Sequence, residues 1–72
     1  MTLDKLIPGE RGLVRKINDH ILMRRLIALG FYEGGEVRCA FSAPSGDPAA
    51  YEYAAGCVAL RRRDAGKVEL WD

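Results

Sequence analysis

The sequence predicts a small, mainly β fold: a five-stranded barrel with one short α-helix inserted after the first strand. Five short stretches alternate apolar and polar residues, as strands with one buried face do. One stretch has helical spacing instead, and no repeated strand–helix–strand pattern indicates a parallel sheet. A barrel that closes its own edges is therefore the economical arrangement. The 72 residues are expected to form one domain, 1–72, because so short a chain buries only ~60% of its unfolded surface.

The N-terminal part predicts a single turn and then a strand. Thr2 can cap a turn through the sequence LDKL, and Pro8 and Gly9 end that turn. Residues 11–17 (RGLVRKI) are β-prone, and we expect Val14 and Ile17 to face inward.

Residues 19–29 are predicted to form the helix. Asn18 and Asp19 are both good N-cap residues, and Gly30 stands where a C′ residue with positive φ is needed. Three leucines recur at helical spacing and are expected to face the core: Leu22, Leu26 and Leu29.

The rest of the chain returns to the period of strands. A tight reversal is expected at Ala55 and Gly56, and residues 61–66 (RRRDAG) are expected to form one helical or turn segment. The inward faces are predicted to carry Val37, Cys39 and Phe41; then Ala49, Tyr51 and Tyr53; then Val58 and Leu60; and finally Val68 and Leu70, with Trp71 pointing outward.

Residues 42–48 (SAPSGDP) predict a rigid loop between two strands. Pro44 and Pro48 cannot donate to a sheet ladder, and Gly46 with Asp47 is a typical turn pair. Prolines on both sides lower the entropy lost when the loop orders. Two interpretations stay open: the loop presents a binding surface, or it only sets strand register.

Charge and hydropathy exclude several classes of protein. Eleven basic and ten acidic side chains give a net charge of +1, which argues against a nucleic-acid partner. We therefore interpret Arg24 and Arg25, and the run at residues 61–63, as solvated charge. No apolar run approaches the ~20 residues that span a bilayer, and the N-terminus does not resemble a signal peptide. A cytoplasmic protein that does not itself span the membrane is expected.

The sequence contains no recognisable catalytic or cofactor motif. His20 is the one histidine, and it lies at a predicted helix start. A histidine that acts as a catalytic base needs a nucleophile and an orienting group, and no motif in the sequence supplies them. We expect no enzymatic activity, no catalytic residue and no cofactor, since the glycine of SGDP lacks phosphate-loop spacing. Cys39 and Cys57 are predicted to lie on opposite faces of their strands, so we expect no metal site built by the protein alone.

Five motifs, in order, resemble the FeoA family of small cytoplasmic ferrous-iron transport proteins: LIPGERGLVRKI, RRLIALGF, GGEV, APSGDPAAYEY and LRRRDAGKVEL. The resemblance covers Leu3 to Leu70. It implies an SH3-like barrel without enzymatic activity and a membrane partner, FeoB, which has a GTP-binding domain and a ferrous-iron permease. The sequence departs from the family pattern at Glu33, where proline is frequent, at Ala49 and Ala50, and at Trp71.

From the residues and this resemblance we expect an accessory protein that binds and modulates a FeoB-like iron transporter. Two alternatives are a repressor-linked or nucleic-acid-associated SH3-like interaction domain and a metal chaperone that carries iron. Met23 and Ile27, spaced i and i+4 beside Arg24, are expected on a helix side away from the leucines. They either meet the partner or pack under the loop. The predicted partner-binding residues are Met23, Arg24 and Ile27, the loop residues Pro44, Gly46, Asp47 and Pro48, and Trp71, which is also a candidate contact in a homo-oligomer.

Overall fold

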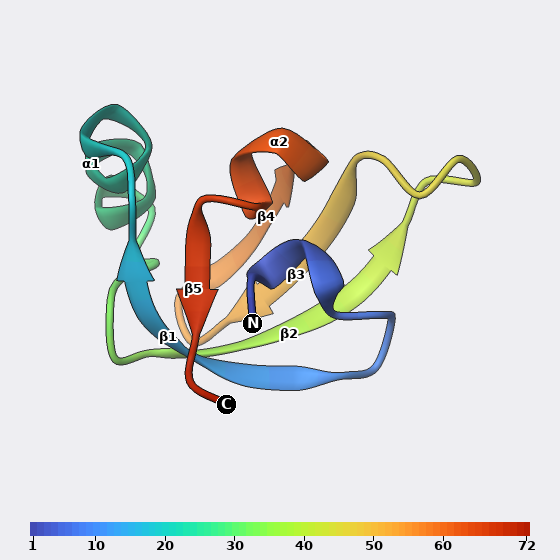
Figure 1. Cartoon of the computed structure of the whole chain (residues 1–72), viewed down its shortest axis with the longest axis horizontal. Coiled ribbons are helices and arrows are strands. Elements are labelled where there is room, and N and C mark those ends of the chain that lie inside the picture. Colours follow the sequence, from blue (N-terminus) through green and yellow to red (C-terminus); the bar gives the residue numbers. More distant parts are fainter.

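The computed structural model describes all 72 residues and confirms a mainly β fold with one helix of more than two turns after the first strand (Figure 1). All strand pairs are antiparallel. The elements are η1 (Leu3–Lys5), β1 (Arg11–Ile17), α1 (His20–Ala28), β2 (Glu36–Ser42), β3 (Ala49–Tyr53), β4 (Gly56–Leu60), α2 (Arg62–Ala65) and β5 (Val68–Leu70).

The five strands form one open sheet in the order β4-β3-β2-β1-β5. The prediction that the barrel closes its own edges is wrong, because β4 and β5 do not pair. The outer edge of β5 is occupied by the N-terminus instead: Thr2 bridges to Glu69, and the Leu70 amide donates to the Met1 carbonyl over 2.7 Å. The short helix α2 joins the two end strands and buries Ala65 completely beside η1.

The turn before β1 forms as expected, but Thr2 does not cap it. Residues Leu3–Lys5 form one 3₁₀ turn, and the Thr2 hydroxyl bonds to the Asp4 carboxylate rather than to a backbone amide. Leu3 is buried at the base of this turn.

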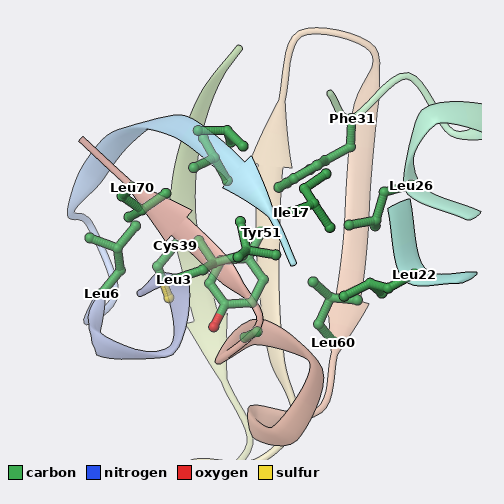
Figure 2. Packing of buried hydrophobic residues seen from close by; sticks show 14 residues of the cluster. Leu3, Leu6, Ile17, Leu22, Leu26, Phe31, Cys39, Tyr51, Leu60 and Leu70 are labelled. Atoms are coloured by element: carbon green, nitrogen blue, oxygen red, sulfur yellow. The ribbon is translucent and has the colours of Figure 1, made fainter. Parts of the chain in front are cut away.

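A cluster of 14 buried residues fills the space between the sheet and the helices, and Figure 2 shows Leu22 of α1 pointing toward Leu60 of β4. The inward faces predicted for β1, β4 and β5 are confirmed, with Val58 half-buried. On β3, Tyr51 is buried, and Ala49 and Tyr53 pack against the cluster as predicted. The cluster comprises Leu3, Leu6, Val14, Ile17, Leu22, Leu26, Phe31, Val37, Cys39, Tyr51, Leu60, Ala65, Val68 and Leu70.

Phe41 departs from the predicted alternation on β2. Val37 and Cys39 are buried as expected, but the Phe41 side chain is 64% exposed. Cys39 pairs with Tyr51 while Phe41 pairs with Ala50, so the register shifts between them. Such a bulge places one extra residue in the strand and reverses the facing of the side chains beyond it.

The helix begins and ends close to the predicted residues. Asp19 is its N-cap and accepts a hydrogen bond from the Leu22 amide over 2.8 Å. Gly30 has φ of +86°, as predicted for the residue that ends the helix. Leu22 and Leu26 are buried, but the inward prediction for Leu29 is wrong, since this side chain is half exposed. The helix stops at Ala28, so Leu29 stands at the C-cap rather than in a further helical turn over the core.

Candidate partner-binding surfaces

The predicted partner-binding residues lie in three separate places. Figure 1 shows α1 at one end of the long axis and the loop of residues 43–48 at the other, with the C-terminus at the lower edge of the sheet. The structure therefore does not bring Met23, Arg24 and Ile27 together with the loop. It also excludes the alternative that the Met23 and Ile27 pair packs under that loop.

The outer face of α1 carries the most exposed large hydrophobic side chain of the molecule. Ile21 is 74% exposed and Ile27 is 51% exposed. Arg24 and Ala28 are also exposed and lie between the two isoleucines on the helix circumference. Met23 is half-buried and packs against the core, so the prediction that it belongs to the free side is wrong. We call Ile21, Arg24, Ile27 and Ala28 the helix patch.

The loop of residues 43–48, which we call the proline loop, is held by its own hydrogen bonds and by one to α2. The Ala43 amide donates to the Pro48 carbonyl over 2.9 Å, and the Gly46 amide donates to the Ala43 carbonyl over 2.7 Å. Gly46 has φ of +88°, and the Asp47–Pro48 peptide bond is cis. Pro44, Asp47 and Pro48 are exposed at the loop surface.

Asp47 has a structural role that its place in the sequence did not indicate. Its carboxylate accepts a hydrogen bond from the Arg62 amide over 2.9 Å, at the first residue of α2. The residue at the N-cap position, Arg61, makes no side-chain cap. A carboxylate from another segment therefore satisfies one of the free amides at the start of this helix.

Trp71 lies on the outer face as predicted and is exposed. The Arg15 guanidinium carbon lies 5.1 Å from the centre of its ring, within the range of a cation–π contact. The Trp71 amide donates to the Leu13 carbonyl over 2.9 Å, and the Leu13 side chain is exposed too. Leu13, Arg15 and Trp71 form a second mixed surface, the Trp71 patch, on β1 and the chain end.

The charges that lack a partner within the chain are all basic. Each of the ten acidic side chains is in an ion pair or accepts a hydrogen bond. Five of the eleven basic residues are in ion pairs. The other six are Lys16, Arg24, Arg25, Arg61, Arg62 and Arg63. Both helices thus carry free positive charge on a chain whose net charge is only +1.

The residues considered for catalysis and metal binding are dispersed. His20 is exposed at the first position of α1. Cys39 is buried and Cys57 is exposed, so the two thiols lie on opposite faces as predicted. No three His, Cys, Asp or Glu side chains are grouped so that they could hold a metal ion. None of the helices has both the length and the apolar character needed to cross a bilayer.

The five antiparallel strands and the inserted helix define a small SH3-like β domain. Residues 1–70 match the FeoA domain, and the chain belongs to the FeoA family. The resemblance seen in the sequence is thereby confirmed.

Three relatives show how far the similarity extends. The FeoA protein of Chlorobium tepidum is 28% identical, with a TM-score of 0.90 over 97% of this chain and 68% of that one. FeoA of Stenotrophomonas maltophilia, described as an SH3 domain protein and solved in complex with zinc, is 32% identical, with a TM-score of 0.83 over 97% of this chain and 88% of that one. A Porphyromonas gingivalis protein that fuses Fe(2+) transport protein A to the Fe(2+) transporter FeoB is 30% identical over 71 residues. The match covers 97% of this chain and 8% of the fusion protein.

Proposed function

We propose that this chain is a non-enzymatic accessory protein of ferrous-iron uptake that binds the cytoplasmic side of a FeoB-like transporter and modulates it. The observation that carries the proposal is the Porphyromonas gingivalis fusion, in which a domain similar to nearly the whole of this chain is joined to FeoB. Joining two domains in one chain raises their effective concentration to roughly millimolar values for short linkers. The fusion therefore favours a direct contact between a FeoA domain and FeoB.

The helix patch is the surface that we propose for this contact. Ile21 and Ile27 offer apolar area that the fold does not bury, and such exposed patches mark interaction sites in small proteins. Arg24, which lies between them, has no ion-pair partner within the chain. A partner surface with aliphatic side chains and a carboxylate would complement both features.

Co-purification from membranes tests the proposal. An affinity-tagged chain is incubated with solubilised membranes that contain the FeoB-like transporter of the same organism, and the bound proteins are identified. We expect the wild-type chain to retain the transporter, and Ile21→Glu and Ile27→Glu to lose most of it while circular dichroism and melting stay near wild type. The matched control is Phe41→Glu, which places the same charge at an exposed apolar position on β2.

The outcomes separate the function from the surface. If the wild-type chain retains no transporter, the proposed function is wrong. If the wild-type chain and both helix variants retain it equally, the function stands and the helix patch is not the contact surface.

A further inference from the structure

A cavity of about 210 Å³ lies between η1, the proline loop and α2, away from the helix patch. Its walls are largely apolar, with a few polar groups among them. Cavities that bind free small molecules usually measure roughly 300–1,000 Å³, so this one has the size for a single side chain. The lining residues are Asp4, Leu6, Ile7, Pro8, Ser42, Gly46, Ala49, Tyr51, Leu60 and Arg62.

The Tyr51 hydroxyl is the polar group that the fold leaves without a partner. The residue is only 2% exposed, and Figure 2 shows its hydroxyl at the end of the ring that points away from Leu22 and Leu26. The Tyr51 hydroxyl makes no hydrogen bond within the chain. It is not fully enclosed, because no fully buried side-chain oxygen lacks a partner. Since Tyr51 lines the cavity, a group in the cavity can reach this hydroxyl. Burial raises the pKa of Tyr51 to about 12. The phenol is therefore neutral at physiological pH and can donate or accept a hydrogen bond.

Asp4 supplies a carboxylate that is largely withdrawn from water. Its side chain is 14% exposed, and one oxygen accepts a hydrogen bond from the Thr2 hydroxyl. The nearest cation is the ammonium of Lys5, which lies 3.9 Å from the other oxygen and is itself well exposed. A carboxylate has about four acceptor positions, so Asp4 keeps capacity for a further donor.

Arg62 brings a charge of the opposite sign to the side of the cavity next to the proline loop. A Cβ at Gly46 would come within 3.2 Å of Arg62 Nη2, which places the guanidinium over this glycine. Arg62 is exposed, whereas Asp4 is mostly buried. Charges in water are screened more strongly than charges withdrawn from it. The Asp4 carboxylate therefore outweighs the Arg62 guanidinium, and the cavity favours a positively charged group.

We infer that this cavity receives the ammonium group of a lysine side chain from a partner protein. The aliphatic stem packs against Ile7, Pro8 and Leu60, and the ammonium donates to the Asp4 carboxylate and the Tyr51 hydroxyl. Lysine fits better than arginine because its ammonium is compact, whereas a planar guanidinium requires a wider fork of acceptors.

The experiment uses nuclear magnetic resonance of the full ¹⁵N-labelled chain and needs no transporter, so its result does not depend on the proposed function. The probes are the N-acetyl methylamides of lysine, norleucine and glutamate. We expect the lysine probe to shift the amides of Asp4, Gly46 and Arg62 in a saturable manner. Norleucine, which keeps the stem and lacks the ammonium, should bind about tenfold more weakly or worse, as expected when a charge-assisted hydrogen bond is lost.

Variants assign the binding to the two polar groups. Asp4→Asn should weaken the lysine probe about tenfold, and Tyr51→Phe should weaken it by a smaller factor. Glu10→Gln is the control, because Glu10 does not line the cavity. The comparison of probes on the wild-type chain stands even if a variant fails to fold.

Three results would overturn the inference. Tighter binding of glutamate than of lysine would show that Arg62 governs an anion site. Equal binding of lysine and norleucine would show that the ammonium is not recognised. The absence of saturable shifts with every probe would show that the cavity is not a side-chain site.

Discussion

The Tyr53 hydroxyl donates a hydrogen bond to the backbone carbonyl of Leu29 over 3.0 Å. This contact fastens the end of β3 to the C-terminal end of α1, where the chain turns at Gly30. The ring of Tyr53 also meets Phe31 edge to face, with 5.3 Å between the ring centres. The position of α1 on the sheet therefore depends on a short stretch after the helix as well as on its buried leucines.

Gly30→Ala is predicted to lower the free energy of unfolding by more than about 1 kcal/mol. An L-residue in the left-handed region costs roughly 1–2 kcal/mol, and Gly30 has φ of +86°. A Cβ at this position would also come within 2.6 Å of the Ala55 Cβ, so a clash adds to the strain. Urea unfolding monitored by circular dichroism measures the loss.

Gly34→Ala is the matched control for this effect. Gly34 has φ of +94°, but a Cβ there would meet no atom within 4 Å. Its substitution should therefore cost the backbone strain alone. An equal loss in the two variants would show that the approach of Gly30 to Ala55 does not matter.

Asp19→Asn is predicted to lower the melting temperature at neutral pH, by an amount that disappears in acid. The hydrogen bond from the Leu22 amide, followed by that from Lys67, holds the pKa of Asp19 below its ordinary value of 3.8. A lowered pKa in the folded state gives stability that is fully present above 3.8 and is lost as the pH falls through the folded pKa. Melting of both proteins across this range measures the difference, which should be constant above 3.8. A difference that persists unchanged in strong acid would contradict the assignment.

One of the two cysteines is predicted to react quickly with a thiol reagent in the folded protein. Cys57 is exposed on β4, whereas Cys39 is buried, and burial raises the pKa of the Cys39 thiol. Both effects slow the reaction of Cys39, because the thiolate is the reactive form. Titration with a chromogenic disulfide should release one equivalent before unfolding and the second after it. Two fast equivalents would mean that Cys39 is not in the core.

Trp71 is predicted to fluoresce as a solvent-exposed indole and to be quenched by acrylamide. Its position over Arg15 leaves most of the ring in water. Arg15→Ala should change the quenching slightly and the stability by about 0.5–1 kcal/mol at most. A blue shift with rising protein concentration would support the homo-oligomer that the sequence suggested. Emission typical of a buried indole at every dilution would contradict the outward placement.

The fold could be predicted from the sequence because the apolar residues of its strands and helix recur at the spacing that is typical of each element. Val68 and Leu70 alternate as a strand requires, and Leu22 and Leu26 recur as a helix requires. The bulge before Phe41 was not predictable in this way, since an added residue on one strand is visible only in its pairing with the next. The open sheet was missed because the edge of β5 is covered by the distant N-terminus.

The candidate surfaces were predicted less completely than the core. Ile21 was not among the predicted partner-binding residues, although a helix turns it 100° away from its buried neighbour Leu22. Met23 packs on the core. This could not be predicted from helical spacing alone, because the side chains at the edge of the buried face reach the core only at certain tilts of this nine-residue helix on the sheet. The cap that Asp47 gives to α2, and the cavity beside Tyr51, both join segments far apart in the sequence.

The most direct test of the central claim is a calorimetric titration of this chain into the purified FeoB-like transporter of the same organism in detergent. We predict saturable binding at a fixed ratio, retained by Phe41→Glu and lost by Ile21→Glu and Ile27→Glu. Absence of binding by the folded wild-type chain at every concentration reached would contradict the claim that it acts on the transporter.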